Sequence, residues 1–396
     1  MGRNFLYKIP SNLKEDEYCH EENIVKTAAK IFKKFKHHRE VVTVAEMQSG
    51  KTEVMKRLIY LVNEHNNDIV NMGINISKYN IYIVICASSI NLKKQIKQKL
   101  PENKHKVYHL NDIYIFFKYF QEYESLLITM SDSSLIIFDE SHCDAGINKL
   151  IDKFRTRLES MSKENKTKYY KLSVSATPYE QIFAEYPKVI MKPGKNYYGI
   201  KQMFDTRRAS GIDKGLLPII FQAKNLANIS ECEELLTEIV VCNYYYIFRL
   251  PSNKNVENTV ILNLEKQFRK CKSNIDSYIY DMNYKTNLNE LLKIKPSKPT
   301  LIFIKDKLRM GEYLDTSYVY LVHDDPNNTY THTTAQSLVG RCCGYNKQSH
   351  CTIIYCDYQK AYDHYKWIIN NYDIKHIPPN AKYIETKNGT TKNCIY

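Results

Sequence analysis

The residues with the clearest chemical potential are Gly50, Lys51 and Thr52, which follow one another directly. The β-branched run 41–44 predicts a short buried strand, so these residues stand where that strand would turn into a helix. Backbone N–H groups at a helix N-terminus attract an anion, lysine adds a positive charge for the β- and γ-phosphates, and the threonine hydroxyl can hold Mg²⁺. We therefore expect a nucleotide-phosphate loop, formed by Gln48, Ser49, Gly50, Lys51 and Thr52. The alternative is a polar turn with a surface lysine.

A second candidate site is the acidic pair Asp139 and Glu140, which directly follows the apolar run 135–138. Ligands of an open α/β sheet bind at the carboxyl ends of its strands. There Asp139 is suited to hold Mg²⁺, mostly through water, and Glu140 to orient and deprotonate an attacking water. His142 lies two residues further on, where it could sense the nucleotide. An acidic surface loop is the alternative, but Lys51 upstream weighs against it.

Two further polar segments follow predicted strands. Ser175 and Thr177 come after the strand expected at 172–174, and would lie near the acidic pair, where they could link hydrolysis to domain movement. Ser88 and Ser89 end the apolar run 81–86, before a predicted helix, where small hydroxyl residues suit a nucleic-acid phosphate. For the serines, this segment by itself favours the alternative, an ordinary strand-to-helix loop with a solvated lysine face.

The order of these segments resembles a known family. AEMQSGKT, CASS, DESH and SAT resemble motifs I, Ia, II and III of the superfamily 2 helicases of the DExH type. In the second half, KDKLRMGEYLD resembles motif V, with Lys305 and Arg309 suited to phosphate contact, and TTAQSLVGRCCGY resembles motif VI. The segments KLRMG and GRCCGY also resemble helicases of large DNA viruses and phages, which favours DNA slightly over RNA as the partner.

The resemblance implies an α/β fold with two RecA-like P-loop domains, each a mostly parallel sheet flanked by helices. It also implies ATP and Mg²⁺ as cofactors. Gln336 would contact the nucleotide, and Arg341 would act as the arginine that stabilises charge on the transferring γ-phosphate. We place the first domain at 1–190, a connecting helical segment at 191–258, the second domain at 259–375 and a loose tail at 376–396. TVILNL, at 259–264, is the expected first strand of the second sheet.

The sequence departs from the family pattern in several places. Gln48 stands at the middle glycine of motif I, and Gly344 at the second arginine of motif VI. Gln336 is one residue further from the Gly-Arg pair than is usual. No glutamine precedes Gln48, so the adenine contact of many superfamily 2 helicases is missing or made differently, and other NTPs stay open as substrates.

Composition limits the partners and the compartment. The chain has 396 residues, of which 43% are hydrophobic, and a formal net charge of +14, which favours a polyanionic partner such as nucleic acid. No apolar run is long enough to cross a bilayer, and the first residues are too polar for a signal peptide. We expect no membrane partner and no secretion. The expected location is the cytoplasm or another reducing compartment, including a virus factory or virion if the protein is viral.

The 11 cysteines are scattered and odd in number, which argues against a disulfide framework. Four cysteines could form a zinc site, namely Cys342, Cys343, Cys351 and Cys356. Cysteine is more commonly a small apolar filler, so that is the expected role.

Three functions remain open. They are an NTP-dependent helicase or translocase, a nucleic-acid-stimulated NTPase that remodels protein–nucleic acid complexes without unwinding, and a non-catalytic nucleotide-switched clamp. The sequence does not indicate an oligomeric state.

Overall fold

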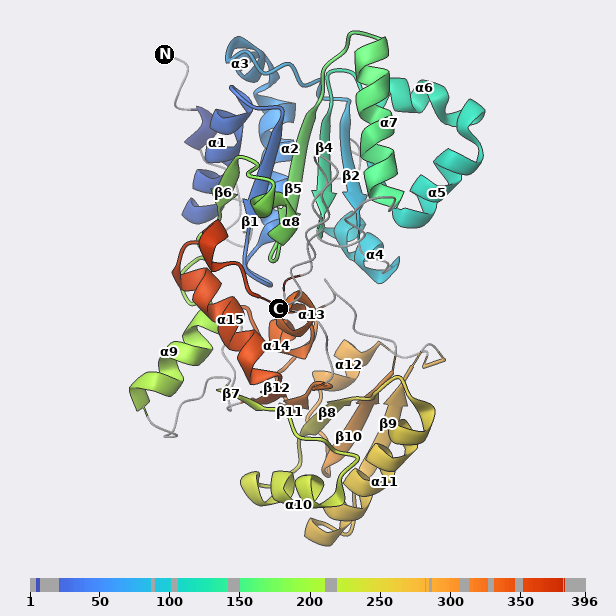
Figure 1. Ribbon diagram of the computed structural model, residues 1–396, viewed down its shortest axis with the longest axis vertical. Helices are drawn as coiled ribbons and strands as arrows, with labels where there is room; N and C mark the ends of the chain where they lie inside the picture. Colours follow the sequence, from blue (N-terminus) through green and yellow to red (C-terminus); the bar gives the residue numbers. More distant parts are fainter. Residues whose placement is uncertain are drawn as a thin grey trace. The chain divides into compact units, whose positions relative to one another are not determined.

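The computed structural model describes residues 5–7, 21–86, 90–100, 106–141, 150–210, 219–281, 283–284, 287–305, 313–326, 331–345, 352–379 and 381. They belong to two compact units, Met1–Lys195 and Asn196–Ala381 (Figure 1). Within these residues, no helix is both long and apolar enough to span a lipid bilayer.

The first unit is built on a six-stranded parallel sheet with strand order β3-β2-β4-β5-β1-β6. Its strands are β1 (Glu40–Val44), β2 (Ile81–Ile85), β3 (Lys106–His109), β4 (Leu135–Asp139), β5 (Tyr170–Ser175) and β6 (Lys188–Ile190). Because all strands run in the same direction, their carboxyl ends meet at one edge of the sheet.

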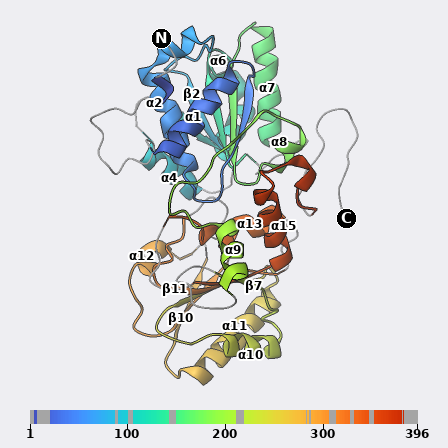
Figure 2. The same cartoon turned by 90° about the vertical axis from the view of Figure 1, so that its left-hand side faces the viewer.

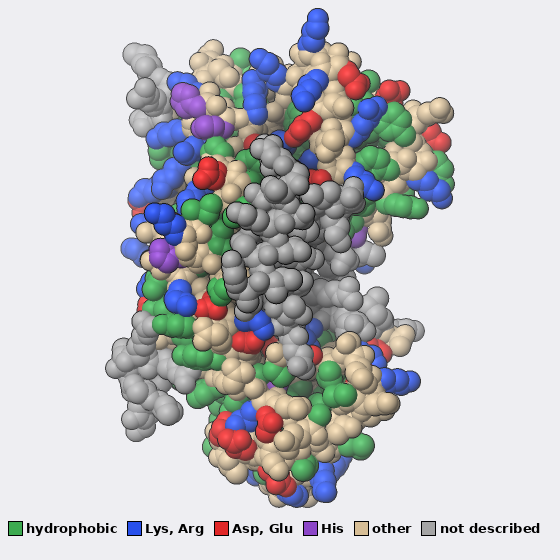
Figure 3. Space-filling view, viewed as in Figure 1, with side chains coloured by type: hydrophobic (Ala, Val, Ile, Leu, Met, Phe, Trp, Pro, Cys, Tyr) green, Lys and Arg blue, Asp and Glu red, His purple; other side chains and the backbone are tan. Residues whose placement is uncertain are grey.

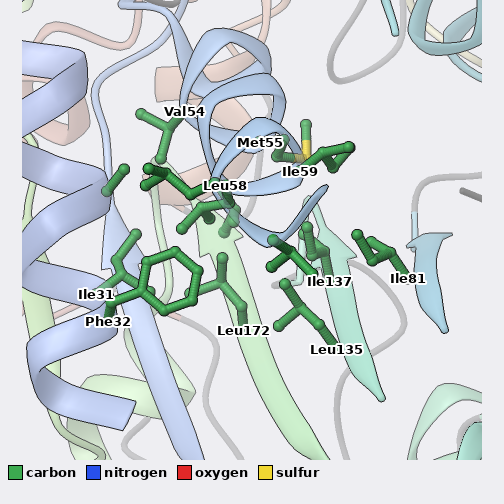
Figure 4. Close-up of a cluster of buried hydrophobic side chains, with 14 of the residues drawn as sticks. Ile31, Phe32, Val54, Met55, Leu58, Ile59, Ile81, Leu135, Ile137 and Leu172 are labelled. Carbon is green, nitrogen blue, oxygen red and sulfur yellow. The ribbon is translucent and has the colours of Figure 1, made fainter. Parts of the chain in front are cut away.

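Helices cover both faces of this sheet (Figure 2). They are α1 (Glu22–Phe35), α2 (Lys51–Glu64), α3 (Asn66–Asn71), α4 (Ile90–Lys99), α5 (Leu110–Lys118), α6 (Phe120–Met130), α7 (Leu150–Glu164) and α8 (Tyr179–Phe183). Side chains of α1 and α2 pack on one face, against Ile137 and Leu172 (Figure 4). Phe138 points to the other face and packs with Phe154 of α7, because successive residues of a strand point to opposite sides. Burial on both faces explains why these strands are continuous apolar runs.

The second unit has its own six-stranded parallel sheet, with strand order β7-β12-β11-β8-β10-β9. The strands are β7 (Ile219–Gln222), β8 (Tyr245–Arg249), β9 (Asp276–Tyr280), β10 (Thr300–Ile304), β11 (Val319–His323) and β12 (Ile353–Cys356). The longer helices are α9 (Ile200–Ser210), α10 (Ile229–Glu238), α11 (Lys254–Cys271) and α15 (Tyr358–Ile369), and the shorter ones are α12 (Leu288–Leu292), α13 (Thr331–Gln336) and α14 (Leu338–Arg341). The expected α/β class with two parallel sheets flanked by helices is confirmed.

The predicted strand at 259–264 is wrong, because this segment lies inside α11. Val260, Leu264 and Phe268 are buried at helical spacing, whereas Leu262 is exposed. A short apolar run fits a strand and a buried helix equally well, so its length and neighbours decide between the two. The segment 191–258, predicted to be a connecting helical segment, contributes two strands to the second sheet, β7 and β8.

The turn from β1 into α2 depends on a glycine. Gly50 has φ of +109°, in the left-handed region that side chains with a Cβ rarely adopt. A Cβ at this position would lie 3.2 Å from Ile24 Cδ1 and 3.3 Å from Met191 Cε. The backbone conformation therefore favours glycine at position 50, and a Cβ there would also crowd the ends of two side chains.

We predict that Gly50→Ala destabilises the first unit more than Gly73→Ala does. Gly73 is the matched control, because its φ of +81° carries a similar backbone cost but its Cβ would meet nothing within 4 Å. The backbone cost is roughly 1–2 kcal/mol for each variant, and crowding at Gly50 adds about 1 kcal/mol. Urea unfolding followed by circular dichroism measures both. Equal losses of stability would contradict the packing role of Gly50.

Candidate functional site

The loop between β1 and α2 is held at the carboxyl edge of the first sheet by hydrogen bonds. The Ala45 N–H donates to the Ser175 carbonyl at the end of β5 (3.0 Å). The Ser49 N–H and hydroxyl both donate to the Glu46 carbonyl, at 3.2 and 2.7 Å. The loop is therefore a tight turn attached to the neighbouring strand.

Gln48 occupies the place of the middle glycine in the motif that the sequence resembles. Its φ is +53°, so the left-handed conformation that favours glycine occurs here in a glutamine. A non-glycine residue in this region costs on the order of 1–2 kcal/mol. The loop thus departs from the pattern in residue type, while its backbone at Gln48 adopts the conformation that the glycine would favour.

The structure brings Lys51 and Glu140 together. Lys51 is the first residue of α2, and Glu140 follows the last residue of β4; Lys51 Nζ lies 2.6 Å from Glu140 Oε1. Their side chains are only 13% and 4% exposed, so the ion pair is largely shielded from solvent. Since β5 lies between β1 and β4, the ion pair joins loops that follow strands roughly two strand spacings apart, about 10 Å. Glu140 has φ of +52°, a strained conformation of the kind that concentrates at functional sites.

Asp139 lies buried beside this pair, as the last residue of β4. Burial, and next the negative charge of Glu140, raise the pKa of Asp139 to about 7, although the ammonium of Lys51 acts in the opposite direction. A divalent cation at this carboxylate would favour its charged form. Carboxylate and hydroxyl oxygens are the ligands that Mg²⁺ prefers, and Mg²⁺ usually keeps several waters, so Asp139 with Thr52 in the first turn of α2 is a suitable donor set.

Ser175 and Thr177 lie between the two loops, because β5 is the strand between β1 and β4. Both are fully buried, and the Thr177 N–H donates to Ser175 Oγ (3.0 Å). Gln181, on α8, adds a contact that the sequence did not reveal, since its Nε2 donates to the Ser141 carbonyl (3.2 Å). A single buried glutamine has no sequence pattern that could have identified it. These hydrogen bonds join the end of β5 to the loops after β1 and β4.

In the second unit, Gln336 ends α13 and Arg341 ends α14, and both side chains are buried. Asp324, directly after β11, fixes the start of α14 by accepting a hydrogen bond from the Leu338 N–H (3.2 Å). Its other carboxylate oxygen accepts from Arg249 Nε at the end of β8 (2.8 Å). The sequence did not reveal this contact, because a single aspartate after a strand has no pattern that identifies its partners.

The remaining predicted site residues divide into two groups. Lys305 follows β10 and forms an ion pair with Glu257, with 2.5 Å between Nζ and Oε2. His142, Ser88, Ser89 and Arg309 lie outside the described residues. For the zinc hypothesis, Cys342, Cys343 and Cys356 are buried free thiols, and Cys351 is outside the described residues. Within the described part of the chain, no three His, Cys, Asp or Glu side chains gather as a metal site would require.

Comparisons with known proteins agree with this fold. The E. coli DExH-box NTPase HrpB superposes with a TM-score of 0.50 at 11% sequence identity, over 86% of this chain and 42% of the HrpB chain. The chain therefore spans less than half the length of that NTPase, and the likeness concerns the fold. A structure of Mycobacterium smegmatis helicase Lhr bound to ssDNA and AMP-PNP gives a TM-score of 0.38 at 11% identity, over 91% of this chain and 46% of the Lhr chain, a value from which no common fold follows.

No protein-family model matches the sequence. One relative is similar along its whole length, with 61% identity over 396 residues that cover 100% of both chains. The chain therefore belongs to the same protein family as uncharacterized protein L594 of Acanthamoeba polyphaga mimivirus.

Proposed function

We propose that this protein is an NTP-dependent helicase or translocase that acts on nucleic acid, with ATP and Mg²⁺ as cofactors. The observation that carries the proposal is the buried pair of Lys51 and Glu140, with 2.6 Å between Nζ and Oε1, beside the buried Asp139. A helix N-terminus, a lysine and two carboxylates at one edge of a parallel sheet are suited to bind a triphosphate and to activate a water.

Binding of the nucleotide would release Glu140 from Lys51. A triphosphate carries more negative charge than one carboxylate, so the ammonium of Lys51 would move to the phosphates, assisted by the N–H groups at the start of α2. Glu140 could then orient a water and accept its proton. Thr52 and Asp139 would hold Mg²⁺, which when bound neutralises part of the phosphate charge. Gln48 and Ser49 would line the phosphates.

We further propose that Ser175 and Thr177 couple hydrolysis to movement, with His142 sensing the nucleotide. Support comes from the position of the two hydroxyl residues on the strand between the phosphate loop and the acidic pair. Loss of the γ-phosphate would change the contacts of both loops. The Ala45 N–H donates to the Ser175 carbonyl and the Ser141 N–H donates to the Val174 carbonyl, so both loops are attached to the end of β5.

Arg341 would stabilise the charge that develops on the transferring γ-phosphate, and Gln336 would contact the nucleotide. In support, α14 is anchored by the carboxylate of Asp324 at the Leu338 N–H, so the backbone that carries Arg341 is fixed before the nucleotide binds. A fixed guanidinium costs little reorganisation during the reaction.

Nucleic acid is the proposed partner because the formal net charge is +14 and because polar residues follow strands in both units. Ser88, Ser89, Lys305 and Arg309 are the proposed phosphate contacts, with DNA favoured over RNA through the resemblance to viral helicases. To contact a phosphate, Lys305 would have to exchange its ion pair with Glu257 for the new partner.

We predict that Glu140→Gln lowers nucleotide hydrolysis by roughly 10²–10³-fold and retains nucleotide binding, because it removes the proton acceptor but keeps the side-chain shape. Phosphate release, with and without polynucleotide, measures hydrolysis, and a fluorescent ATP analogue measures binding. Lys51→Ala should lose both. Lys56→Ala is the control, since Lys56 lies on the same helix and pairs with Glu53 at 3.0 Å. Normal hydrolysis by Glu140→Gln would contradict the assignment of the base.

We predict that Arg341→Ala lowers turnover by roughly 10³-fold with little change in nucleotide affinity, because the arginine acts on the transition state. Arg269→Ala, on an exposed position of α11, is the control. Circular dichroism should verify that each variant folds. Normal turnover in a folded Arg341→Ala protein would contradict a role of the second unit in hydrolysis.

In the parent protein, duplex-unwinding and translocation assays separate a helicase from a remodelling NTPase.

A further inference from the structure

A row of basic side chains lies at the amino edge of the first sheet, the edge opposite to the Lys51–Glu140 pair. We call this row the basic rim and define it as Arg39, Lys78, Lys106, Lys166 and Lys168. Arg39 directly precedes β1, Lys78 precedes β2, Lys106 is the first residue of β3, and the other two precede β5. All five residues are exposed. Strands of about five residues separate the two edges by roughly 15 Å.

Backbone hydrogen bonds align the segments of the basic rim. The strand order places β3, β2, β4, β5 and β1 side by side. The Arg39 carbonyl accepts from the Lys171 N–H at 2.7 Å, and the Lys168 carbonyl accepts from the Ser133 N–H at 2.7 Å. The Ser133 carbonyl in turn accepts from the Ser77 N–H, next to Lys78, at 2.7 Å. Four strand spacings give the row a length of about 20 Å.

The positive charge of the basic rim is not neutralised within the described residues, where no rim side chain forms an ion pair with a carboxylate. Three carboxylates at this edge already have cationic partners. Lys171 pairs with Glu40 at 2.6 Å and with Glu159 at 2.7 Å, and Glu164 lies 3.8 Å from Arg157. Asp132, before β4, is the exposed acid in the row. Lys and Arg side chains extend from this end of the first unit, uppermost in Figure 3.

Helix dipoles do not account for every residue of the basic rim. Lysines in the last turns of α1 and α7, such as Lys33 and Lys163, are explained by attraction to the helix C-termini. The rim residues lie outside these helices, and Lys78 and Lys106 precede or begin strands. Arg39 is held in place by the ring of Tyr170, 4.3 Å from its guanidinium carbon. Like charges collected along one edge repel each other, so a polyanion would stabilise them.

We infer that the basic rim binds the phosphate backbone of duplex nucleic acid, in addition to the strand on which the proposed motor acts. A duplex presents one phosphate charge per roughly 1.7 Å of its axis, so the row of about 20 Å faces on the order of ten charges. Single-strand sites rely on several aromatic side chains for base stacking. Among the described residues of the rim segments, Tyr79 is the exposed aromatic, at 69%. The same segments lack the apolar centre typical of a protein interface.

The basic rim would give the protein a second binding site for nucleic acid. Its site is separated from the Lys51–Glu140 pair by the length of the sheet strands, so duplex binding there requires no nucleotide. A duplex held at the basic rim would keep the protein close to the strand on which it acts. The inference can therefore be tested independently of hydrolysis.

The test is a triple variant, Lys78→Gln, Lys166→Gln and Lys168→Gln, assayed for binding of a blunt-ended DNA duplex without nucleotide, across a series of salt concentrations. We expect affinity at low salt to fall roughly tenfold or more, because phosphate contacts dominate such binding. The slope of log K against log salt should decrease in magnitude by about 2–3, since each lost contact contributes about 0.9. Basal nucleotide hydrolysis should match that of the parent.

The matched control is Lys254→Gln, Lys266→Gln and Lys272→Gln, which removes the same charge from exposed positions on and beside α11. The control should retain more than half of the parent's affinity. Equal losses in both triple variants, or an unchanged slope in the rim variant, would overturn the inference. Single-stranded DNA and polyglutamate are tested in the same binding assay. A loss of affinity by the rim variant for only one of these two probes would also overturn the inference, because it would assign the surface to another partner. Because the assay contains no nucleotide, an inactive motor site would not change its outcome.

Discussion

The parallel direction of the strands is the constraint on which the rest of the structure depends. In each unit all six strands run the same way, so every strand ends at one edge and begins at the other. In the first unit the carboxyl edge therefore collects the loops after β1, β4 and β5, and with them Lys51, Asp139, Glu140 and Ser175. Since the sheet is buried on both faces, this edge is where polar residues can gather without disturbing the core.

The ion pair between Lys51 and Glu140 gives that edge its chemical character. A lysine with a carboxylate partner at 2.6 Å is held in position without a ligand, and the carboxylate is shielded from water. The neighbouring Asp139 is buried among these charges, and its raised pKa indicates that the site favours an additional cation. Two loop residues, Gln48 and Glu140, adopt left-handed backbone conformations, which are energetically unfavourable for residues other than glycine. The preformed ion pair, the metal donor set and the local strain are the features on which the proposed nucleotide hydrolysis rests.

The amino edge of the same sheet has the opposite composition. There the strands begin beside basic residues. Glu40, Glu159 and Glu164 pair with Lys171 or Arg157, and Asp132 is exposed. One sheet thus separates the buried carboxylates of Asp139 and Glu140 from a cationic surface. The second unit repeats the parallel architecture, and Asp324 there joins β8, β11 and α14 through a single buried carboxylate. In both units, residues at or next to strand ends hold the loops, and in the first unit Gln181 of α8 adds a further contact.

The sequence by itself determined which polar residues directly follow apolar strands. The predicted strands before Ala45, Cys86 and Asp139 are strands, and the α/β class with two parallel sheets, which the resemblance implied, is confirmed. The order of the strands was decided only by tertiary structure, and so was the meeting of Lys51 with Glu140, which are 89 residues apart. Tertiary packing also decided that 259–264 is a helix, that Gln48 has a positive φ, and that Gln181 and Asp324 support the loops. The physical reason is that burial and side-chain type are encoded locally, whereas the strand ends that become neighbours depend on the packing of the whole sheet.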